Sequence, residues 1–163
     1  MARRKIAAGN WKMNMTPSEA KALCADLKPL VADSKSEVIY CVPAIDITTV
    51  AECIKGTNVK LGAQNMYIED KGAFTGETSP KMLKECGVDY IIIGHSERRE
   101  IFKECDCLIN AKVKKAIETG ITPILCCGET LEQREKGVTL DHIRLQIKSD
   151  LFEVSKDDVK NLV

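Results

Sequence analysis

The sequence predicts an α/β protein organised around a parallel β-sheet. Strand and helix patterns alternate along the chain, and residues 90–93 form a continuous apolar run, which is typical of a strand covered on both faces. Five strand–helix units with right-handed crossovers fit an open doubly wound sheet or a (β/α) barrel. The first strand leads into Gly-Asn-Trp-Lys instead of a glycine-rich dinucleotide motif, but periodicity alone leaves both architectures open.

Cap and turn residues define the expected elements. The first helix starts with Thr16 at the cap, Pro17 at the first helical position and Glu19 in a capping box, and Thr130 opens a later capping box. The apolar face of the first helix is expected at Ala20, Leu23, Leu27 and Leu30. The expected strands are residues 5–8, 37–42, 59–63, 90–93 and 121–127, with the start of a sixth at 162–163. The expected helices are residues 16–30, 47–54, 80–86, a turn from Ser96, 105–119 and 130–154.

Residues 64–78 show no periodicity. A loop of this length inside a compact domain is usually functional or disordered. The glycines around Phe74 favour an ordered loop that projects and packs on another surface, such as a second subunit.

Composition excludes several classes of function. The 163 residues suit a single domain, 1–163, and the 24 basic and 24 acidic side chains form no basic patch for nucleic acid. The apolar segment after the basic N-terminus ends at Gly9 and is too short for a signal peptide or a membrane span. A cytoplasmic, non-membrane protein is therefore expected. The eight cysteines are interpreted as free thiols, because adjacent Cys126 and Cys127, and Cys105 and Cys107 two apart, match neither metal-ligand nor disulfide spacing.

His95 follows the apolar run 90–93, at the strand end where ligands of parallel sheets bind. Ser96 is expected to cap a helix, which places His95 beside N–H groups whose positive dipole end keeps an imidazole neutral. A neutral ring is able to donate a hydrogen bond to a reacting oxygen. The alternative is a structural histidine at the edge of the core whose ring nitrogens are already hydrogen-bonded. This segment alone leaves both interpretations open.

Five motifs together resemble the triosephosphate isomerase family, in its order and spacing and across the whole chain. They are residues 9–14, 62–65, 72–77, 94–99 and 127–129. The resemblance implies an α/β fold, a (β/α) TIM barrel that is truncated here at the start of the sixth strand, and usually a homodimer. It also implies the interconversion of dihydroxyacetone phosphate and glyceraldehyde 3-phosphate through an enediolate, without cofactor or metal.

The same resemblance implies roles for individual residues. His95 matches the family's electrophile, Lys12 the cation that faces phosphate and the developing oxyanion, and Glu97 a carboxylate that pairs with the lysine. Asn10 matches the partner of Lys12 in substrate binding, and Cys126 a residue packed behind the catalytic base. The residues that match the family's dimer interface are Met13, Asn14, Gln64 and Thr75.

One part of the family pattern has no match in these residues. In the family the proton-abstracting carboxylate follows strand six, with a lid and phosphate-binding loops after it, so we expect the general base to be missing from this chain. Neither Glu77, Glu97 nor Glu129 is assigned to that role. Three functions remain: an isomerase completed by further sequence, an inactive barrel fragment or structural module that retains part of the phosphate site, and a related phosphosugar enzyme, which the five motifs disfavour. We expect the chain alone to be inactive, and either to self-associate through unpaired strand edges or to be partly disordered at its C-terminal end.

Overall fold

A computed structural model describes residues 4–163, which form two compact units that meet in the chain between Ile91 and Ile92. Hydrogen-bonded strands follow one another in chain order, β1-β2-β3-β4-β5, so the predicted arrangement of successive β/α units is confirmed. The elements of the first unit are β1 (Ile6–Asn10), α1 (Pro17–Val31), β2 (Glu37–Val42), η1 (Ala44–Asp46), α2 (Ile47–Ile54), β3 (Val59–Ala63) and α3 (Pro80–Glu85). β4 (Tyr90–Ile93) spans the boundary between the units. The elements of the second unit are α4 (Ser96–Glu100), α5 (Asp106–Thr119), β5 (Thr122–Leu125), α6 (Leu131–Glu135), α7 (Thr139–Asp150) and α8 (Lys156–Val159).

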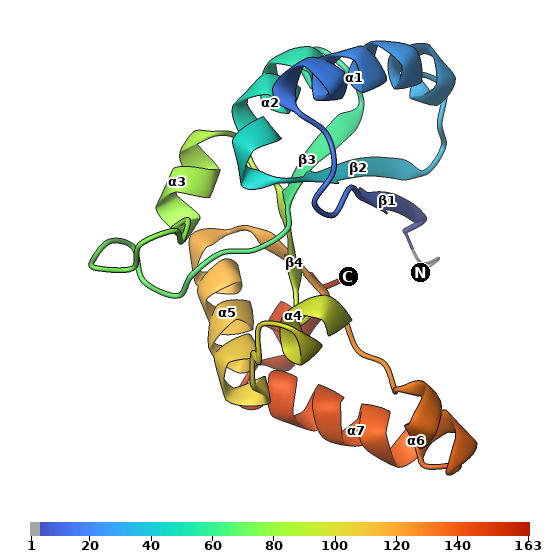
Figure 1. Ribbon diagram of the computed structural model, residues 1–163, viewed down its shortest axis with the longest axis vertical. Coiled ribbons are helices and arrows are strands. Elements are labelled where there is room, and N and C mark those ends of the chain that lie inside the picture. Colours follow the sequence, from blue (N-terminus) through green and yellow to red (C-terminus); the bar gives the residue numbers. More distant parts are fainter. Residues whose placement is uncertain (1–3) are drawn as a thin grey trace. The chain divides into compact units, whose positions relative to one another are not determined.

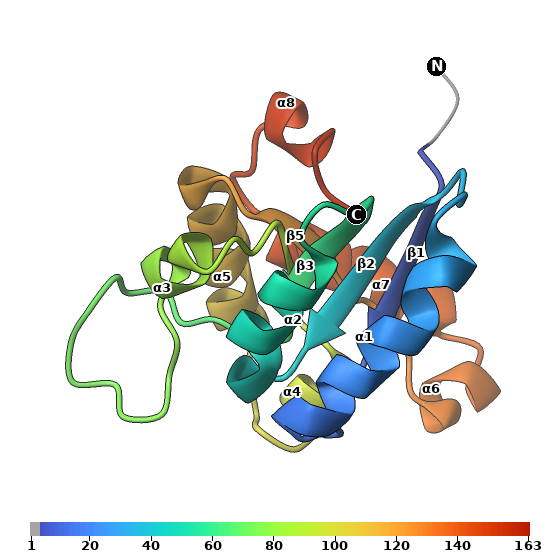
Figure 2. The same cartoon turned by 90° about the horizontal axis from the view of Figure 1, so that it is seen from above.

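The first unit is a parallel sheet with two helices packed against it. β1 pairs with β2 from Ile6 opposite Glu37, and β2 pairs with β3 from Val38 opposite Val59. Figures 1 and 2 show α1 and α2 side by side over these strands. The inner faces of these helices and the strands enclose a core in which Ile39, Val50 and Leu61 are almost fully buried. The apolar residues of both the helices and the strands therefore pack against one another here.

The expected apolar face of α1 is wrong at one position. Ala20 and Cys24 are buried, whereas Leu30 is 78% exposed. Three helical turns of 3.6 residues carry the face from position 20 to 31, not 30. Val31, which is half-buried, therefore occupies the next inward place.

In the second unit α5 packs against both α7 and β5. The Cys126 N–H donates to the Ile93 carbonyl at 2.9 Å, which joins the ends of the two strands. Val163 donates to the Pro123 carbonyl and accepts from the Leu125 N–H, at 3.0 and 2.9 Å. The predicted start of a sixth strand thus has the hydrogen bonds of a strand neighbour at Val163.

The helical region expected at residues 130–154 is divided into two helices, α6 and α7. The capping box at Thr130 and Gln133 does open α6. Gly137 then has a φ of 72°, a left-handed conformation that ends a helix and that glycine adopts without a Cβ clash.

The loop from residue 64 to 78 is ordered and projects from the first unit, as Figure 2 shows beside α3. The Tyr67 N–H donates to the Thr78 carbonyl at 2.9 Å and so closes the base of the loop. The rings of Tyr67 and Phe74 lie 4.5 Å apart, while Phe74 remains 39% exposed. The loop is therefore held by its own contacts, and its tip is available to another surface.

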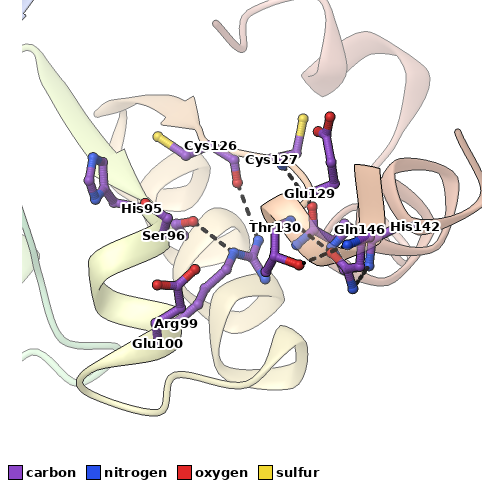
Figure 3. A pocket seen from close by; sticks show the side chains of 13 residues that line it. His95, Ser96, Arg99, Glu100, Cys126, Cys127, Glu129, Thr130, His142 and Gln146 are labelled. Atoms are coloured by element: carbon purple, nitrogen blue, oxygen red, sulfur yellow. Dashed lines mark hydrogen bonds between the residues drawn. The ribbon is translucent and has the colours of Figure 1, made fainter. Parts of the chain in front are cut away.

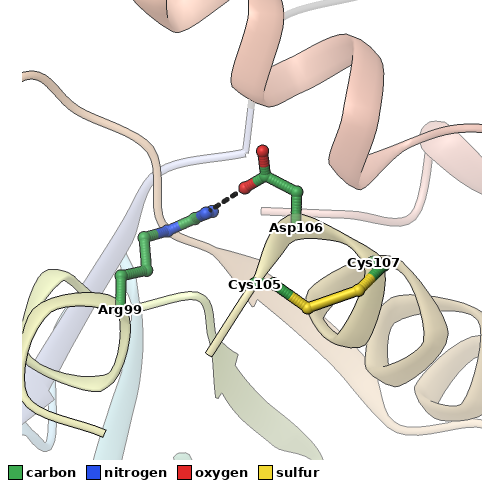
Figure 4. The surroundings of a disulfide bond; sticks show 4 residues. All are labelled: Arg99, Cys105, Asp106 and Cys107. Carbon is green, nitrogen blue, oxygen red and sulfur yellow. Dashed lines mark hydrogen bonds and ion pairs between the residues drawn. A yellow bond between two sulfur atoms is a disulfide. The ribbon is translucent and has the colours of Figure 1, made fainter. Parts of the chain in front are cut away.

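The interpretation of every cysteine as a free thiol is wrong at one pair, because Cys105 and Cys107 form a disulfide (Figure 4). Cys105 is the N-cap of α5 with extended backbone angles, φ −81° and ψ 160°, and Cys107 lies in the first helical turn. Side chains two residues apart on a regular helix face apart, but the extended cap turns this pair together, with Cα atoms 5.4 Å apart. The other six cysteines are free.

Candidate functional site

The residues predicted for the site divide between the two units. Each half is built on loops that follow the carboxyl ends of strands, where parallel sheets bind ligands. In the first unit they are Asn10, Lys12, Met13, Asn14, Gln64 and Thr75, and in the second His95, Glu97 and Cys126.

The loop after β1 is shaped by Asn10. Its side-chain Oδ1 accepts the Lys12 backbone N–H at 2.9 Å, and Lys12 has a φ of 54°. A left-handed conformation is uncommon for a residue with a side chain and often marks a functional position. The Trp11 N–H donates to the Cys41 carbonyl at 3.0 Å, which ties the loop to β2. The exposed side chain of Lys12 is thus presented from a fixed backbone.

The four residues predicted for a dimer interface lie near the surface of the first unit. Met13 is 96% exposed, and Asn14 and Thr75 are also exposed. The Asn14 side chain donates to the Trp11 carbonyl at 2.7 Å. Gln64 is half-buried and donates to the Cys41 carbonyl at 2.9 Å, so it anchors the start of the projecting loop.

His95 itself, not Ser96, is the N-cap of α4. Its Nδ1 accepts the Glu97 backbone N–H at 3.2 Å, in the place where a shorter polar side chain would cap a helix. An accepting Nδ1 carries no proton, so the neutral ring has its proton on Nε2. The Glu97 carboxylate lies 3.4 Å from the same Nδ1, a pair that would be ionic only with a protonated ring. We favour the cap, because the Glu97 N–H points at the nitrogen lone pair.

A cavity of about 500 Å³ opens beside His95 within the second unit. Figure 3 shows side chains from the end of β4, α4, the segment after β5 and α7 around it. The lining residues are Gly94, His95, Ser96, Arg99, Glu100, Cys126, Cys127, Gly128, Glu129, Thr130, Gln133, His142 and Gln146. His142 is half-buried and contacts Gln133 through Nδ1 at 3.2 Å.

Arg99 links several segments around this cavity, and no role was predicted for it from the sequence. Its Nε donates to the Gly94 carbonyl at 2.7 Å, directly before His95, and Nη2 donates to the Cys126 carbonyl at 3.3 Å. Nη2 also contacts Asp150 at 2.6 Å, and Nη1 contacts Asp106 at 2.5 Å. The pairing with Asp150 spans 51 residues, which no local pattern reveals. An arginine inside a recognised motif was the only available signal.

Burial has the largest effect on the pKa of two groups, Asp150, which is paired with Arg99, and Cys126, which lines the cavity. It raises the pKa of Asp150 to about 6, although the hydrogen bond and charge of Arg99 oppose it. It likewise raises the pKa of the Cys126 thiol, so Cys126 is a poor nucleophile, in keeping with a packing role.

Glu129 lines the cavity but is already engaged. A hydrogen bond from its own backbone N–H and one from Arg134, at 2.9 Å, lower the pKa of Glu129. A carboxylate stabilised in its ionised form is a weak proton acceptor. Residues 4–163 contain no group of three or more histidine, cysteine or acidic side chains placed to hold a metal ion. Over the same residues no helix has the length and apolarity needed to cross a membrane.

Strands paired in chain order, helices between them and polar residues at the strands' carboxyl ends define a β/α protein of the TIM-barrel class. A sequence profile of triosephosphate isomerase matches residues 5–163. The chain therefore belongs to the triosephosphate isomerase family.

Individual relatives agree with this assignment. Triosephosphate isomerase of Clostridium botulinum (strain Loch Maree) is 56% identical, and that of Caldanaerobacter subterraneus subsp. tengcongensis 55%, each over 99% of this chain and 65% of the relative. The crystal structure of triosephosphate isomerase from Bartonella henselae superposes with a TM-score of 0.91 at 36% identity, covering 99% of this chain and 66% of that one. The chain thus spans just under two thirds of the length of these relatives. The superposition confirms the barrel over the open doubly wound sheet.

Proposed function

We propose that this chain supplies the part of a triosephosphate isomerase site that the first five strands carry. Asn10 and Lys12 bind the triose phosphate, and His95 polarises its carbonyl group. The observation that most supports this is the cap of α4, where Nδ1 of His95 accepts the Glu97 N–H and leaves an Nε2–H as a donor.

In the proposed reaction a base removes a proton from the carbon beside the substrate carbonyl. The electron pair moves onto the carbonyl oxygen, where the Nε2–H of His95 and the ammonium of Lys12 stabilise the enediolate. Groups fixed before the reaction stabilise this charge without reorganising, and the stabilisation grows in the transition state. The cap on His95 and the left-handed turn at Lys12 supply that fixation. Glu97 pairs with the catalytic lysine in this scheme.

We assign the proton-abstracting carboxylate to none of these residues. Glu129 is held by Arg134, and Glu97 is reserved for Lys12 in the scheme. A polypeptide of residues 1–163 made alone is therefore inactive as an isomerase, and activity returns when the rest of the barrel is supplied.

The assembly is a homodimer formed through Met13, Asn14, Gln64 and Thr75. In support, Met13 is 96% exposed, and the loop that carries Thr75 projects from its unit. The reaction takes place in the cytoplasm as a step of glycolysis and gluconeogenesis, which six free cysteines favour because reduced thiols persist there.

The test compares the chain alone with a chimera. The chimera continues residues 1–163 with the part of the Clostridium botulinum relative that follows its match, and a coupled assay measures glyceraldehyde 3-phosphate turnover. We expect no turnover above background from the chain alone and clear turnover from the chimera. An active isolated chain of verified mass would contradict the proposal, because a carboxylate within these residues would then be the base.

Within the chimera, Lys12→Met should lower kcat/KM about 10²–10³-fold, the usual cost of removing one preorganised electrostatic group. Lys21→Met, on exposed α1, is the matched control and should retain activity. Near-parental efficiency of the Lys12 variant with native circular dichroism would remove Lys12 from the site.

Nitrogen NMR on histidine tests the donor directly. The neutral ring of His95 should show its proton on Nε2. A proton on Nδ1 in the folded chain would contradict both the cap and the proposed role of the ring.

A further inference from the structure

We propose that Cys105 and Cys107 form a reversible thiol–disulfide exchange site that reacts with small disulfides. The pair caps and opens α5, and both side chains are exposed. This chemistry lies outside the isomerase reaction and does not depend on it.

The bond is poorly suited to a structural role. Its sequence separation is 2, and a cross-link stabilises chiefly by shortening the loops of the unfolded chain. A ring this small removes few unfolded conformations. Of the eight cysteines, all of which lie in the described residues, only these two are joined, although Cys127 is also exposed and is adjacent to Cys126. The pairing therefore follows the extended cap of α5, and not exposure or closeness in sequence alone.

The start of α5 favours the reactive thiolate. Cys105 makes no side-chain cap hydrogen bond, and the positive dipole end of α5 favours negative charge at positions 105 and 107. Asp106 lies between the cysteines and would oppose a thiolate, but its carboxylate is paired with Arg99 Nη1 at 2.5 Å (Figure 4). The pairing therefore removes the main local repulsion.

A surface depression gives a small molecule access to Cys107. It has a volume of about 540 Å³ and is lined by Asp106, Cys107, Asn110, Lys148, Ser149 and Phe152. The exposed ammonium of Lys148 favours an anionic disulfide, and the exposed Phe152 ring offers an apolar wall. A peptide disulfide with carboxylates, of the glutathione type, has this chemistry.

The exchange proceeds in two balanced steps. The Cys107 thiolate attacks one sulfur of the small disulfide, the S–S bond breaks, and one thiolate leaves. The Cys105 thiolate then attacks the Cys107 sulfur of the mixed disulfide, and the second small thiolate leaves. The protein loses two thiol protons and two electrons, and one small disulfide is reduced to two thiols.

The experiment uses the full chain in buffers with graded ratios of oxidised and reduced glutathione. After trapping with iodoacetamide, trypsin releases residues 104–112, which contain both cysteines and no other. We expect this peptide to pass from two alkyl groups to an internal disulfide as the ratio rises, and to return on reduction. In Cys105→Ser and Cys107→Ser the remaining thiol should carry glutathione instead, whereas Cys127→Ser should leave the transition unchanged.

The entry route has its own control. Lys148→Ala should slow reaction with glutathione disulfide about threefold, the order expected for one screened surface charge, and leave reaction with neutral hydroxyethyl disulfide unchanged. A peptide that stays doubly alkylated at every ratio, or that carries glutathione on both cysteines, would overturn the proposal. Equal slowing with both disulfides would overturn the role of the depression.

Discussion

Lys112→Met tests a buried ion pair that the sequence did not predict. The Lys112 ammonium lies 2.7 Å from Oε1 of Glu104, and Arg98 Nε contacts the same oxygen at 2.6 Å. The side chains of Lys112 and Glu104 are only 3% and 5% exposed. Burial opposes ionisation of Glu104, but the hydrogen bonds from Lys112 and Arg98 outweigh it and lower the pKa of Glu104. Methionine keeps most of the apolar stem of Lys112 and removes the charge.

The expected loss follows from what remains around Glu104. Breaking a buried pair costs about 3–5 kcal/mol when the other charge is left without compensation. Here Arg98 still compensates Glu104 in part, so we expect about 2–3 kcal/mol. With a urea m value of about 2 kcal/mol/M, the unfolding midpoint should fall by roughly 1 M.

The assay is urea unfolding followed by circular dichroism at several protein concentrations. The matched control is Lys114→Met on the same helix, whose partner Glu153 lies 3.0 Å away with 69% of its side chain exposed. An exposed pair of this kind contributes about 0–1 kcal/mol. Equal losses in the two variants would refute the argument that burial makes the Glu104 pair strong.

The pH dependence supplies an independent check. Because the folded pKa of Glu104 is below its ordinary value of 4.5, its contribution is full above that value and is lost as pH falls through the folded value. The difference between the parent and Lys112→Met should therefore shrink in acid. A difference that stays constant from pH 7 to below 4 would show that packing, not charge, causes the loss.

Three further changes address the second unit and the sheet edge. Gly94→Ala should lower the free energy of unfolding in urea by about 2 kcal/mol, because φ is 72° and the new Cβ would lie 2.8 Å from Arg99 Nη2. The control Gly137→Ala has the same φ but open space around the new Cβ, and should lower it by about 1 kcal/mol. Equal losses in the two variants would contradict the clash. The folded pKa of Asp150, about 6, is above its ordinary value of 3.8, so the stability that its protonated form contributes is lost as pH rises from 3.8 through about 6. Asp150→Asn should remove this fall in the free energy of unfolding. A pH profile of stability that is the same in the parent and the variant would contradict the prediction. The isolated chain should self-associate in sedimentation, because β1 has one strand neighbour among the described residues and exposes Ala8. Ala8→Lys should weaken that association. A monomer at all protein concentrations would contradict the prediction.

The strands were the most predictable part of the fold. β2, β3 and β4 have the bounds predicted from sequence, since each is a short run of mostly β-branched or apolar residues between turn signals. Caps were also readable where they depend on residues three apart, as at Thr16 and Thr130. Local patterns succeed where the interactions are local.

The failures share a physical cause, because each depends on a conformation or partner that the local pattern does not contain. Ser96 has the better capping side chain, but His95 caps α4 because the turn after Gly94 places its ring over the Glu97 N–H. Lys112 belongs to an apolar helix face only because Glu104 and Arg98 neutralise it there. The disulfide between Cys105 and Cys107 requires the extended backbone of the α5 cap.

The geometry at His95 is encoded within a few consecutive residues. Gly94, before the ring, has its carbonyl fixed by Arg99, and the ring is fixed by the N–H of Glu97. The more distant anchor of Arg99, Asp150, also lies in the second unit. None of these contacts requires a residue outside 92–163. The proposed electrophile should therefore be formed before the rest of the site, so the Nε2 tautomer of His95 should be the same in the isolated chain and in the chimera, even though we expect only the chimera to turn over substrate.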